Sequence, residues 1–420
     1  MKLLFIGLNY TPEPVGIGPY TAGLAEAMAA RGAQVCVVAG KPYYPQWRAY
    51  RDQARGIHTA LENGVRVTRV PHYIPRQPSG LRRLLHHASF AATAFIPAML
   101  RARTRADADA YTRPGLVFVV APSLLSVAVG WCAARIAGAR LWVHVQDFEI
   151  EAAVATGLLR DGSIAARWLL AIAMTMERRL LQGADVVSAI SPQMCARLKE
   201  KGVAPPRIRE LRNWSNAAFG FERSDDTAYR QQWCIGARKV ALYSGNIANK
   251  QGIEVVIAAA ALLEKRADIL FIICGEGPNR EQLAASSAHL DNVQLHDLQP
   301  AQRMGDLLSL ASVHLLPQIA GAADLVLPSK LTNMLRSGRP VVATALPGTG
   351  LFAEVEGCGI AVAPGDPQAF ADAIIKLVDE PQLASACGEA ALARAAERWD
   401  RDSIVADFDK AASALVQAGE

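Results

Sequence analysis

Short apolar runs rich in β-branched residues alternate with segments of helical periodicity along the whole chain. This alternation is typical of parallel βαβ units. In the first half it predicts strands at residues 3–8, 35–39, 65–70, 116–121, 141–145 and 186–190. The pattern then restarts, with predicted strands at residues 240–244, 269–274, 293–296, 313–316, 341–343 and 360–362. The sequence therefore predicts an α/β protein of two doubly wound units.

Residue types that begin and end helices lie between the predicted strands. A helix over residues 20–31 is expected to end at Gly32, and another helix at Gly138, because glycine is favoured just beyond a helix C-terminus. Ser191 followed by Pro192 fits a helix N-cap and first helical position.

The length of the chain also favours two domains. At 420 residues it exceeds what one hydrophobic core usually supports. Residues 213–227 are polar and irregular, as expected of a linker, and residues 403–416 carry the apolar stripe of an amphipathic helix. We expect domains at 1–212 and 213–398, followed by a C-terminal helix within 399–420.

Composition excludes several classes of protein. A net charge of +5 is far below that of a dedicated nucleic-acid binder, so no nucleic-acid partner is expected. The seven cysteines are scattered, without a CxxC pair or a histidine cluster at metal-ligand spacing, which indicates a reducing compartment and no metal site. The apolar start fits a first strand better than a signal peptide, and no apolar run approaches the roughly 20 residues that a membrane span needs. Any membrane contact is therefore expected to be peripheral.

The loop after the first predicted strand contains Gly16 and Gly18 and leads into a helix. Ligands of open α/β sheets bind at the carboxyl ends of the strands, and small residues there let backbone amides approach an anion. The two glycines fit a plain turn equally well. Their spacing is not GxGxxG, which disfavours a nicotinamide site.

Two loops follow the first two predicted strands of the second unit. Lys250, four residues after Asn246, lies between a predicted strand and a helix, where its ammonium group suits a diphosphate. A solvated surface lysine is the alternative. The sequence Gly275-Glu276-Gly277-Pro278 permits a tight exit from the next strand.

A fourth loop leads into a helix that begins near Ser329. Ser329, Lys330 and Asn333 offer hydroxyl, ammonium and amide groups to a phosphate or a sugar. In the alternative interpretation Ser329 only caps the helix and Lys330 faces solvent.

Taken in order, these motifs resemble retaining glycosyltransferases of family 4. The shared segments are the glycine-bearing first loop, Gly245-Asn246, Lys250-Gln251-Gly252, Gly275-Glu276-Gly277-Pro278, Pro328-Ser329-Lys330-Leu331 and Ala363-Pro364-Gly365-Asp366-Pro367. The segments Asn9-Tyr10-Thr11-Pro12-Glu13 with Gly16-Ile17-Gly18, Pro42-Tyr43-Tyr44-Pro45 and 328–335 further resemble the colanic-acid-type fucosyltransferase group. The resemblance covers nearly the whole chain.

The resemblance implies a GT-B fold, in which two Rossmann-like domains face a cleft and the C-terminal helix crosses back to the N-terminal domain. It implies an acceptor in the N-terminal domain, a GDP- or UDP-linked sugar in the C-terminal domain, and transfer without a cofactor or metal. The implied catalytic residues are Asp147 and Lys250. The implied donor-binding residues are Gly16, Gly18, Asn246, Lys250, Glu276, Asp324, Ser329, Lys330 and Asn333.

The chain departs from the family pattern at three places. Many members have an arginine at the position of Asn246, and two glutamates with seven residues between them near Asp324 and Asn333, where this chain has neither. Many also have His-Asp after the fifth predicted strand, where a glutamine precedes Asp147 here. We therefore assign the family's acid to Asp147 and interpret His144 as a core histidine.

A further predicted helix lies in a stretch of the chain whose charged residues are all basic. Residues 63–106 contain no acidic residue, and Arg82, Arg83, Arg101 and Arg103 flank an apolar run at 88–100. An apolar helix with basic flanks suits an anionic membrane surface, and a core helix with solvated ends is the alternative. A lipid-linked acceptor, of the undecaprenyl diphosphate type, would explain such a surface.

The sequence thus predicts a retaining glycosyltransferase that moves a sugar, fucose or a related deoxy sugar, to a lipid-linked oligosaccharide. The expected setting is bacterial exopolysaccharide, capsule or O-antigen (lipopolysaccharide) synthesis, with the protein peripheral on the cytoplasmic face of the inner membrane. A nucleotide-sugar epimerase on the same fold would convert the donor without an acceptor. A non-catalytic nucleotide-binding partner protein, which the missing glutamates would allow, would bind the donor without turnover.

Overall fold

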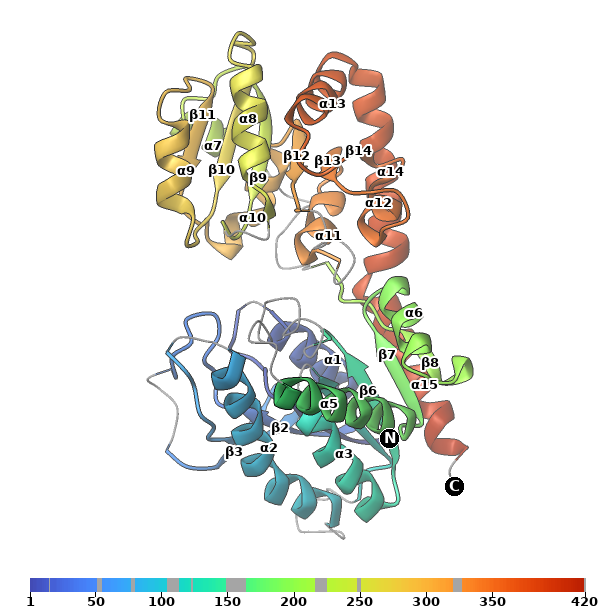
Figure 1. The fold of residues 1–420 in the computed structure, drawn as a ribbon. Coiled ribbons are helices and arrows are strands. Elements are labelled where there is room, and N and C mark those ends of the chain that lie inside the picture. The colour runs from blue at the N-terminus through green and yellow to red at the C-terminus, as the bar shows by residue number, and fades with distance from the viewer. Residues whose placement is uncertain are drawn as a thin grey trace. The chain divides into compact units, whose positions relative to one another are not determined.

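The computed structural model describes residues 1–14, 16–50, 55–76, 80–103, 113–121, 124–148, 164–215, 225–247, 251–319 and 327–418. The chain divides into two compact α/β units (Figure 1). The first unit consists of Met1–Arg212 with Asp402–Glu420, and the second of Asn213–Arg401.

The first unit is built on an eight-stranded sheet with the order β3-β4-β2-β1-β5-β6-β7-β8. Its strands are β1 (Lys2–Gly7), β2 (Gln34–Gly40), β3 (His58–Glu62), β4 (Val65–Val70), β5 (Leu116–Ala121), β6 (Arg140–Val145), β7 (Val186–Ala189) and β8 (Ile208–Glu210). Its helices are α1 (Gly18–Ala30), α2 (Gly80–Arg103), α3 (Leu124–Ala137), α5 (Ile164–Gln182), α6 (Pro192–Glu200), the 3-10 turn η1 (Pro205–Arg207) and α15 (Arg401–Gln417).

Two strands of the first sheet are absent from the sequence prediction, and both lack a buried apolar run. β3 is an edge strand without a fully buried residue, and it pairs antiparallel with β4. β8 has three residues, none of them buried. The other six strands were predicted, and they are the strands whose residues are mostly buried.

The second unit has a six-stranded parallel sheet with the order β11-β10-β9-β12-β13-β14. Its strands are β9 (Lys239–Ser244), β10 (Ile269–Cys274), β11 (Val293–His296), β12 (Val313–Leu316), β13 (Val341–Thr344) and β14 (Gly359–Val362). Its helices are α7 (Thr227–Gln232), α8 (Glu254–Leu262), α9 (Arg280–Ser287), η5 (Ala301–Arg303), α10 (Met304–Ser309), α11 (Ser329–Arg336), α12 (Gly350–Val355), α13 (Pro367–Asp379) and α14 (Pro381–Trp399). The predicted two doubly wound units are confirmed.

Alternation along the strands distributes side chains to the two faces of the second sheet. On β9, Val240 and Leu242 pack with residues of α7 and α10, whereas Ala241 and Tyr243 pack with residues of α8 and α13. Both faces of β9 and β10 are covered by helices, so β10 is apolar throughout, whereas in the edge strand β11 apolar residues alternate with the polar residues Gln294 and His296.

The C-terminal helix α15 packs on the first unit. The ring of Phe408 lies 5.2 Å from that of Phe118 and 5.0 Å from that of Trp142, measured between centroids. The predicted N-cap of α6 is also present, since Ser191 Oγ accepts a hydrogen bond from the Met194 amide at 3.2 Å.

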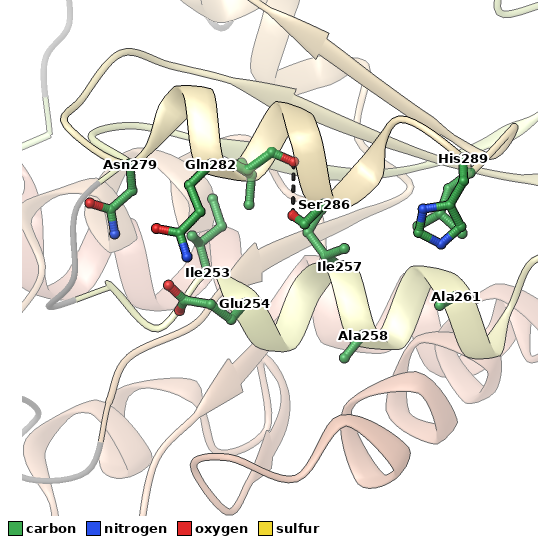
Figure 2. A pocket seen from close by; sticks show the side chains of 11 residues that line it. Ile253, Glu254, Ile257, Ala258, Ala261, Asn279, Gln282, Ser286 and His289 are labelled. Atoms are coloured by element: carbon green, nitrogen blue, oxygen red, sulfur yellow. Dashed lines mark hydrogen bonds between the residues drawn. The ribbon is translucent and has the colours of Figure 1, made fainter.

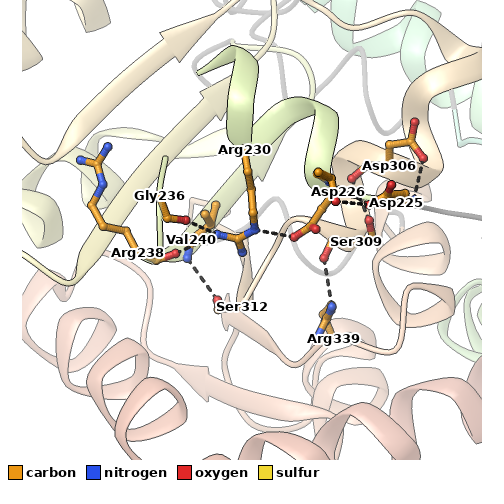
Figure 3. Close-up of polar contacts among 11 residues, drawn as sticks. Asp225, Asp226, Arg230, Gly236, Arg238, Val240, Asp306, Ser309, Ser312 and Arg339 are labelled. Carbon is orange, nitrogen blue, oxygen red and sulfur yellow. Dashed lines mark hydrogen bonds and ion pairs between the residues drawn. The ribbon is translucent and has the colours of Figure 1, made fainter. Parts of the chain in front are cut away.

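A polar network joins α7 to the amino-terminal edge of the second sheet (Figure 3). Arg230 donates to Asp226 at 2.7 Å and to the carbonyl oxygens of Gly236 and Arg238 at 3.1 and 3.2 Å. Nearby, the Val240 amide at the start of β9 donates to Ser312 Oγ at 3.1 Å. These contacts satisfy backbone groups where the sheet ladder begins.

Candidate active site

The strand order reverses between β9 and β12 in the second sheet. Ligands of doubly wound sheets bind beyond the carboxyl ends of the strands at such a reversal. The described residues predicted to bind a donor in this unit follow β9 or β10, or lie in α11.

Two adjacent loops extend the second sheet beyond β9 and β10. The Gly245 amide donates to the Cys274 carbonyl at 2.9 Å, and the Ile247 amide donates to the Glu276 carbonyl at 2.8 Å. A Cβ atom on Gly275 would lie 1.9 Å from the Gly245 carbonyl oxygen. Glycine is therefore required at position 275, because this approach of two backbones leaves no space for a side chain.

Lys330 is directed toward the β9 loop. Its ammonium group donates to the Tyr243 hydroxyl at 3.1 Å and lies 4.3 Å from the centroid of that ring. Burial lowers the pKa of Lys330 to about 8. The alternative in which Lys330 faces solvent is therefore wrong, because the side chain is half-buried and held by Tyr243.

The alternative interpretation also expected Ser329 to cap helix α11, and the structure differs there as well. Ser329 is exposed and is the first helical residue, while Pro328 occupies the N-cap position without a side-chain cap. Ser329 is thus not the helix cap, and its hydroxyl lies on the surface near the amino end of the helix. Asn333 lies one turn further on and is half-buried.

Other donor-binding predictions are distributed around the same loops. Asn246 is exposed, and its carbonyl oxygen accepts a hydrogen bond from the Tyr243 hydroxyl at 2.6 Å. Glu276 is also exposed and lies 3.7 Å from the Arg280 guanidinium. Lys250 and Asp324 lie outside the described residues.

The first loop of the N-terminal unit is organised around a buried carboxylate that the sequence reasoning did not single out. Glu13 accepts hydrogen bonds from the amides of Tyr43 and Tyr44 at 3.0 and 3.1 Å and from Asn9 Nδ2 at 2.9 Å. Burial raises the pKa of Glu13. Glu13 thereby joins the two segments, 9–13 and 42–45, that carry the finer family resemblance.

The two glycines of this first loop lie against the same two segments, 42–45 and 9–13. A Cβ atom on Gly16 would lie 3.2 Å from the ring of Tyr44, and one on Gly18 would lie 3.1 Å from the Tyr10 carbonyl oxygen. Gly18 is the first residue of α1. The glycines therefore allow close packing at the helix start, which is what the plain-turn alternative requires and what an anion site would also use.

Asp147 lies two residues after the end of β6 and is half-buried. Three residues earlier, His144 is buried, and its ring nitrogens lie 2.9 Å from Ser188 Oγ and 2.9 Å from Gln146 Nε2. Burial lowers the pKa of His144 to about 3, so the ring is neutral. The interpretation of His144 as a core histidine is confirmed.

Aromatic and imidazole rings cluster around Tyr43 of the 42–45 segment. The Tyr43 ring is 4.7 Å from that of His86, 5.3 Å from that of His72 and 5.3 Å from that of Trp47. Burial lowers the pKa values of His72 and His86 to about 4 and about 3. Within the described residues no group of three or more His, Cys, Asp or Glu side chains is arranged to hold a metal ion.

Helix α2 has two apolar faces. Phe90, Ala94 and Ala98 are fully buried in the first unit. On another side of the helix, Ile96 and Leu100 are 66% and 63% exposed. A core helix with solvated ends accounts for the first face but not for the second.

The four predicted membrane arginines lie near the two ends of α2. Arg82, Arg83 and Arg103 are exposed, and Arg101 is half-buried. The Arg83 guanidinium lies 6.0 Å from the centroid of the Trp47 ring. Among the described helices, none combines the length and apolar character of a membrane span.

A pocket of about 270 Å³ lies between α8 and α9 (Figure 2). It is lined by Ile253, Glu254, Ile257, Ala258, Ala261, Asn279, Gln282, Leu283, Ser286, His289 and Leu290. The lining is largely apolar and comes from helix faces, whereas the predicted donor residues lie at strand ends and in α11. We therefore do not assign the donor to this pocket.

Comparison with known proteins agrees with this architecture. Residues 15–214 match the family described as glycosyl transferase 4-like domain, and residues 225–394 match glycosyl transferases group 1. An Escherichia coli K12 protein named as a colanic acid biosynthesis glycosyl transferase, WcaI, is 38% identical over 354 residues, or 82% of this chain and 83% of that protein.

Solved structures share the fold. Sucrose-phosphate synthase from Thermosynechococcus elongatus matches with a TM-score of 0.70 at 20% identity, covering 100% of both chains. HepE from Anabaena, solved in complex with UDP-glucose, matches with a TM-score of 0.67 at 17% identity, covering 99% of this chain and 100% of that one.

Two parallel-sheet α/β units of this kind, with polar groups gathered beyond the carboxyl ends of the second sheet, define a glycosyltransferase of the GT-B class. More narrowly, the chain belongs to the family of glycosyltransferases that includes the E. coli protein WcaI and carries a glycosyl transferase 4-like and a group 1 domain. An epimerase on the same fold is not favoured, because both halves of the chain match glycosyltransferase domains.

Proposed function

We propose that this glycosyltransferase moves a sugar from a nucleotide diphosphate donor to a lipid-linked oligosaccharide in bacterial exopolysaccharide or lipopolysaccharide synthesis, with retention of anomeric configuration. The name of the E. coli relative supports the biosynthetic setting. The fucosyltransferase-like motifs at 9–18, 42–45 and 328–335 support fucose or a related deoxy sugar as the group transferred.

The observation that supports a donor in the second unit most strongly is the position of Lys330. Its ammonium group lies beside the Tyr243 hydroxyl at the loop where the strand order reverses. Departure of a nucleoside diphosphate leaves negative charge on the phosphate, and cations and helix N-termini stabilise that charge. We assign this role to Lys330, the amino end of α11 and Lys250, with Asn246, Glu276, Ser329, Asp324 and Asn333 around the donor.

The acceptor is proposed to bind to the first unit. Asp147, at the carboxyl end of β6, is the group that we assign to orient or deprotonate the acceptor hydroxyl. The Gly16–Gly18 loop, at the carboxyl end of β1, lets backbone amides approach a phosphate.

The surface of the first unit supports a lipid-linked acceptor. Helix α3 contacts both α2 and α5. All three helices carry exposed apolar side chains: Leu84, Leu85, Phe95, Ile96 and Leu100 on α2, Trp131 on α3, and Trp168, Ile172 and Met176 on α5. With the arginines of α2, this surface suits an interfacial position on anionic lipid at the cytoplasmic face of the membrane.

The test is a transfer assay with the purified protein, a panel of UDP- and GDP-linked sugars and a bacterial lipid extract. We expect one donor to release its nucleoside diphosphate only when lipid is present, while a lipid-linked oligosaccharide gains the mass of one sugar residue. Asp147→Asn should depress turnover more than donor affinity. Conversion of the donor without lipid would indicate an epimerase, and donor binding without release would indicate a non-catalytic partner protein.

A further inference from the structure

Tyr243, on β9, places a phenol hydroxyl at the polar edge of an otherwise apolar core. Its side chain is fully buried and its ring packs among residues of α8 and α13. The hydroxyl donates to the Asn246 carbonyl oxygen at 2.6 Å and accepts from Lys330 at 3.1 Å. Because its single proton is committed to Asn246, the oxygen presents lone pairs to the ammonium group.

Packing alone does not require this hydroxyl. A phenylalanine would fill the same apolar space with the same ring. The hydroxyl adds two contacts, one to the loop after β9 and one to the first turn of α11. Tyr243 therefore links the two segments that carry the proposed donor ligands.

The local backbone also accommodates Lys330. A Cβ atom on Gly245 would lie 3.2 Å from Lys330 Nζ, which is tighter than ordinary contact. Gly245 has a φ of +147°, a conformation that other residues rarely adopt. The loop thus leaves space for the ammonium group directly beyond the end of β9.

We infer that Tyr243 is a positioning residue that holds the Lys330 ammonium group at the β9 loop, where it binds the diphosphate of the nucleotide-sugar donor. The inference rests on the proposed function of this site. A free lysine side chain samples many rotamers, and ordering it costs conformational entropy when a ligand binds. Contact with both the ring face and the hydroxyl of Tyr243 orders it before the donor arrives.

The test is a double-mutant cycle in nucleotide binding. Calorimetry would measure the affinities of wild type, Tyr243→Phe, Lys330→Met and the double variant for UDP and uridine, and for GDP and guanosine. We expect each single variant to bind the preferred diphosphate at least about tenfold more weakly, the range for a charge-assisted contact, and to bind the nucleoside unchanged. In the Lys330→Met background, Tyr243→Phe should have no further effect.

Tyr229→Phe is the matched control. Tyr229 is also fully buried in the second unit, and its hydroxyl donates to Gln299 at 3.1 Å instead of to a residue of the β9 loop. This variant should leave diphosphate affinity unchanged.

Equal loss of diphosphate and nucleoside affinity in Tyr243→Phe, or the same loss with and without Lys330, would overturn the inference and make Tyr243 a structural residue. Unchanged diphosphate affinity in both single variants would do so as well. Wild-type protein that binds no nucleoside diphosphate would remove the proposed function, and this inference with it.

Discussion

Lys330 shows how a single side chain changes character with its surroundings. In the sequence it is one of 44 basic residues. In the structure its ammonium group is in contact with the ring and hydroxyl of Tyr243, and burial lowers its pKa to about 8. A lysine of ordinary pKa, about 10.4, stays charged over the range in which Lys330 titrates.

This difference predicts the pH dependence of donor binding. Lys330 is charged below its pKa, so affinity for the nucleoside diphosphate should be full below pH 8 and should fall as the pH rises through 8, by at most about tenfold per pH unit. Burial raises the pKa of Tyr243 above its usual range, so the Tyr243 hydroxyl keeps its proton in this window.

The measurement is UDP or GDP affinity between pH 7 and 9.5, with Lys330→Met as the control. The variant should show weaker binding that does not change with pH. A wild-type profile as flat as that of the variant would contradict the assignment of Lys330 to the diphosphate.

The sequence predicted which residues gather at the site better than how they are held there. The sequence correctly indicated that His144 is a core histidine, because a strand residue that faces the interior is buried. The orientation of Lys330 was open, since it depends on a tyrosine 87 positions away in sequence. Glu13 was not predicted as a site residue, because its partners are backbone amides of a distant segment that no side-chain pattern reveals.

At the scale of single elements, helix α2 combines a buried apolar face with exposed apolar side chains. Its buried face belongs to the core of the first unit, while Ile96 and Leu100 remain exposed between arginines near both ends. If this helix lies on lipid, its arginines should contribute on the order of 1 kcal/mol each near an anionic surface.

We therefore expect the wild-type protein to co-sediment with vesicles that contain phosphatidylglycerol, and to do so less at high salt, because attraction is screened beyond about 8–10 Å. Replacing Arg82, Arg83, Arg101 and Arg103 by Gln should abolish co-sedimentation. It should slow transfer to a lipid-linked acceptor and spare transfer to a short water-soluble analogue.

A control variant removes the same number of charges elsewhere. Lys199, Lys239, Lys265 and Lys376 are exposed and lie outside α2, and their replacement by Gln should leave vesicle binding intact. Equal loss of vesicle binding in the two variants would show that binding depends on the net charge of the protein and not on the arginines of α2. Equal loss of transfer to both acceptors in the α2 variant would assign its arginines to the fold or the active site.

The sequence predicted the buried strands accurately and missed exposed ones. Fully buried strands such as β10 are continuous apolar runs and were located within a residue. Strand β3 was missed because an edge strand with exposed positions does not need an apolar run. Its antiparallel pairing with β4 depends on a short turn at Asn63 and Gly64, both with positive φ.

For the whole molecule, the repeated βαβ pattern was sufficient to predict two units, because each sheet requires its own covering helices. Less visible in the sequence is the polar network at the amino-terminal edge of the second sheet (Figure 3). There Arg230 bonds Asp226 and two backbone carbonyl oxygens that precede β9.

This network predicts that removal of Arg230 destabilises the protein more than removal of Arg266. Arg230→Ala should lower the free energy of unfolding by about 1–3 kcal/mol, since it leaves carbonyl oxygens of Gly236 and Arg238 without this partner. Arg266→Ala, which removes two ion pairs with the exposed carboxylates of Asp268 and Asp379, should have a smaller effect because solvent screens those pairs. Urea unfolding of the three proteins would compare them, and a larger loss for Arg266→Ala would contradict the prediction.

The central claim is that the nucleotide-sugar donor binds at the carboxyl edge of the second sheet. Amide hydrogen exchange of the wild-type protein, with and without the best-bound UDP- or GDP-sugar, tests it most directly, since it reports protection along the whole chain. The account predicts slower exchange at residues 243–247, 275–279 and 328–333, and no change along the pocket between α8 and α9 at residues 257–261 and 282–290. Protection confined to that pocket, or to the first unit alone, would contradict it.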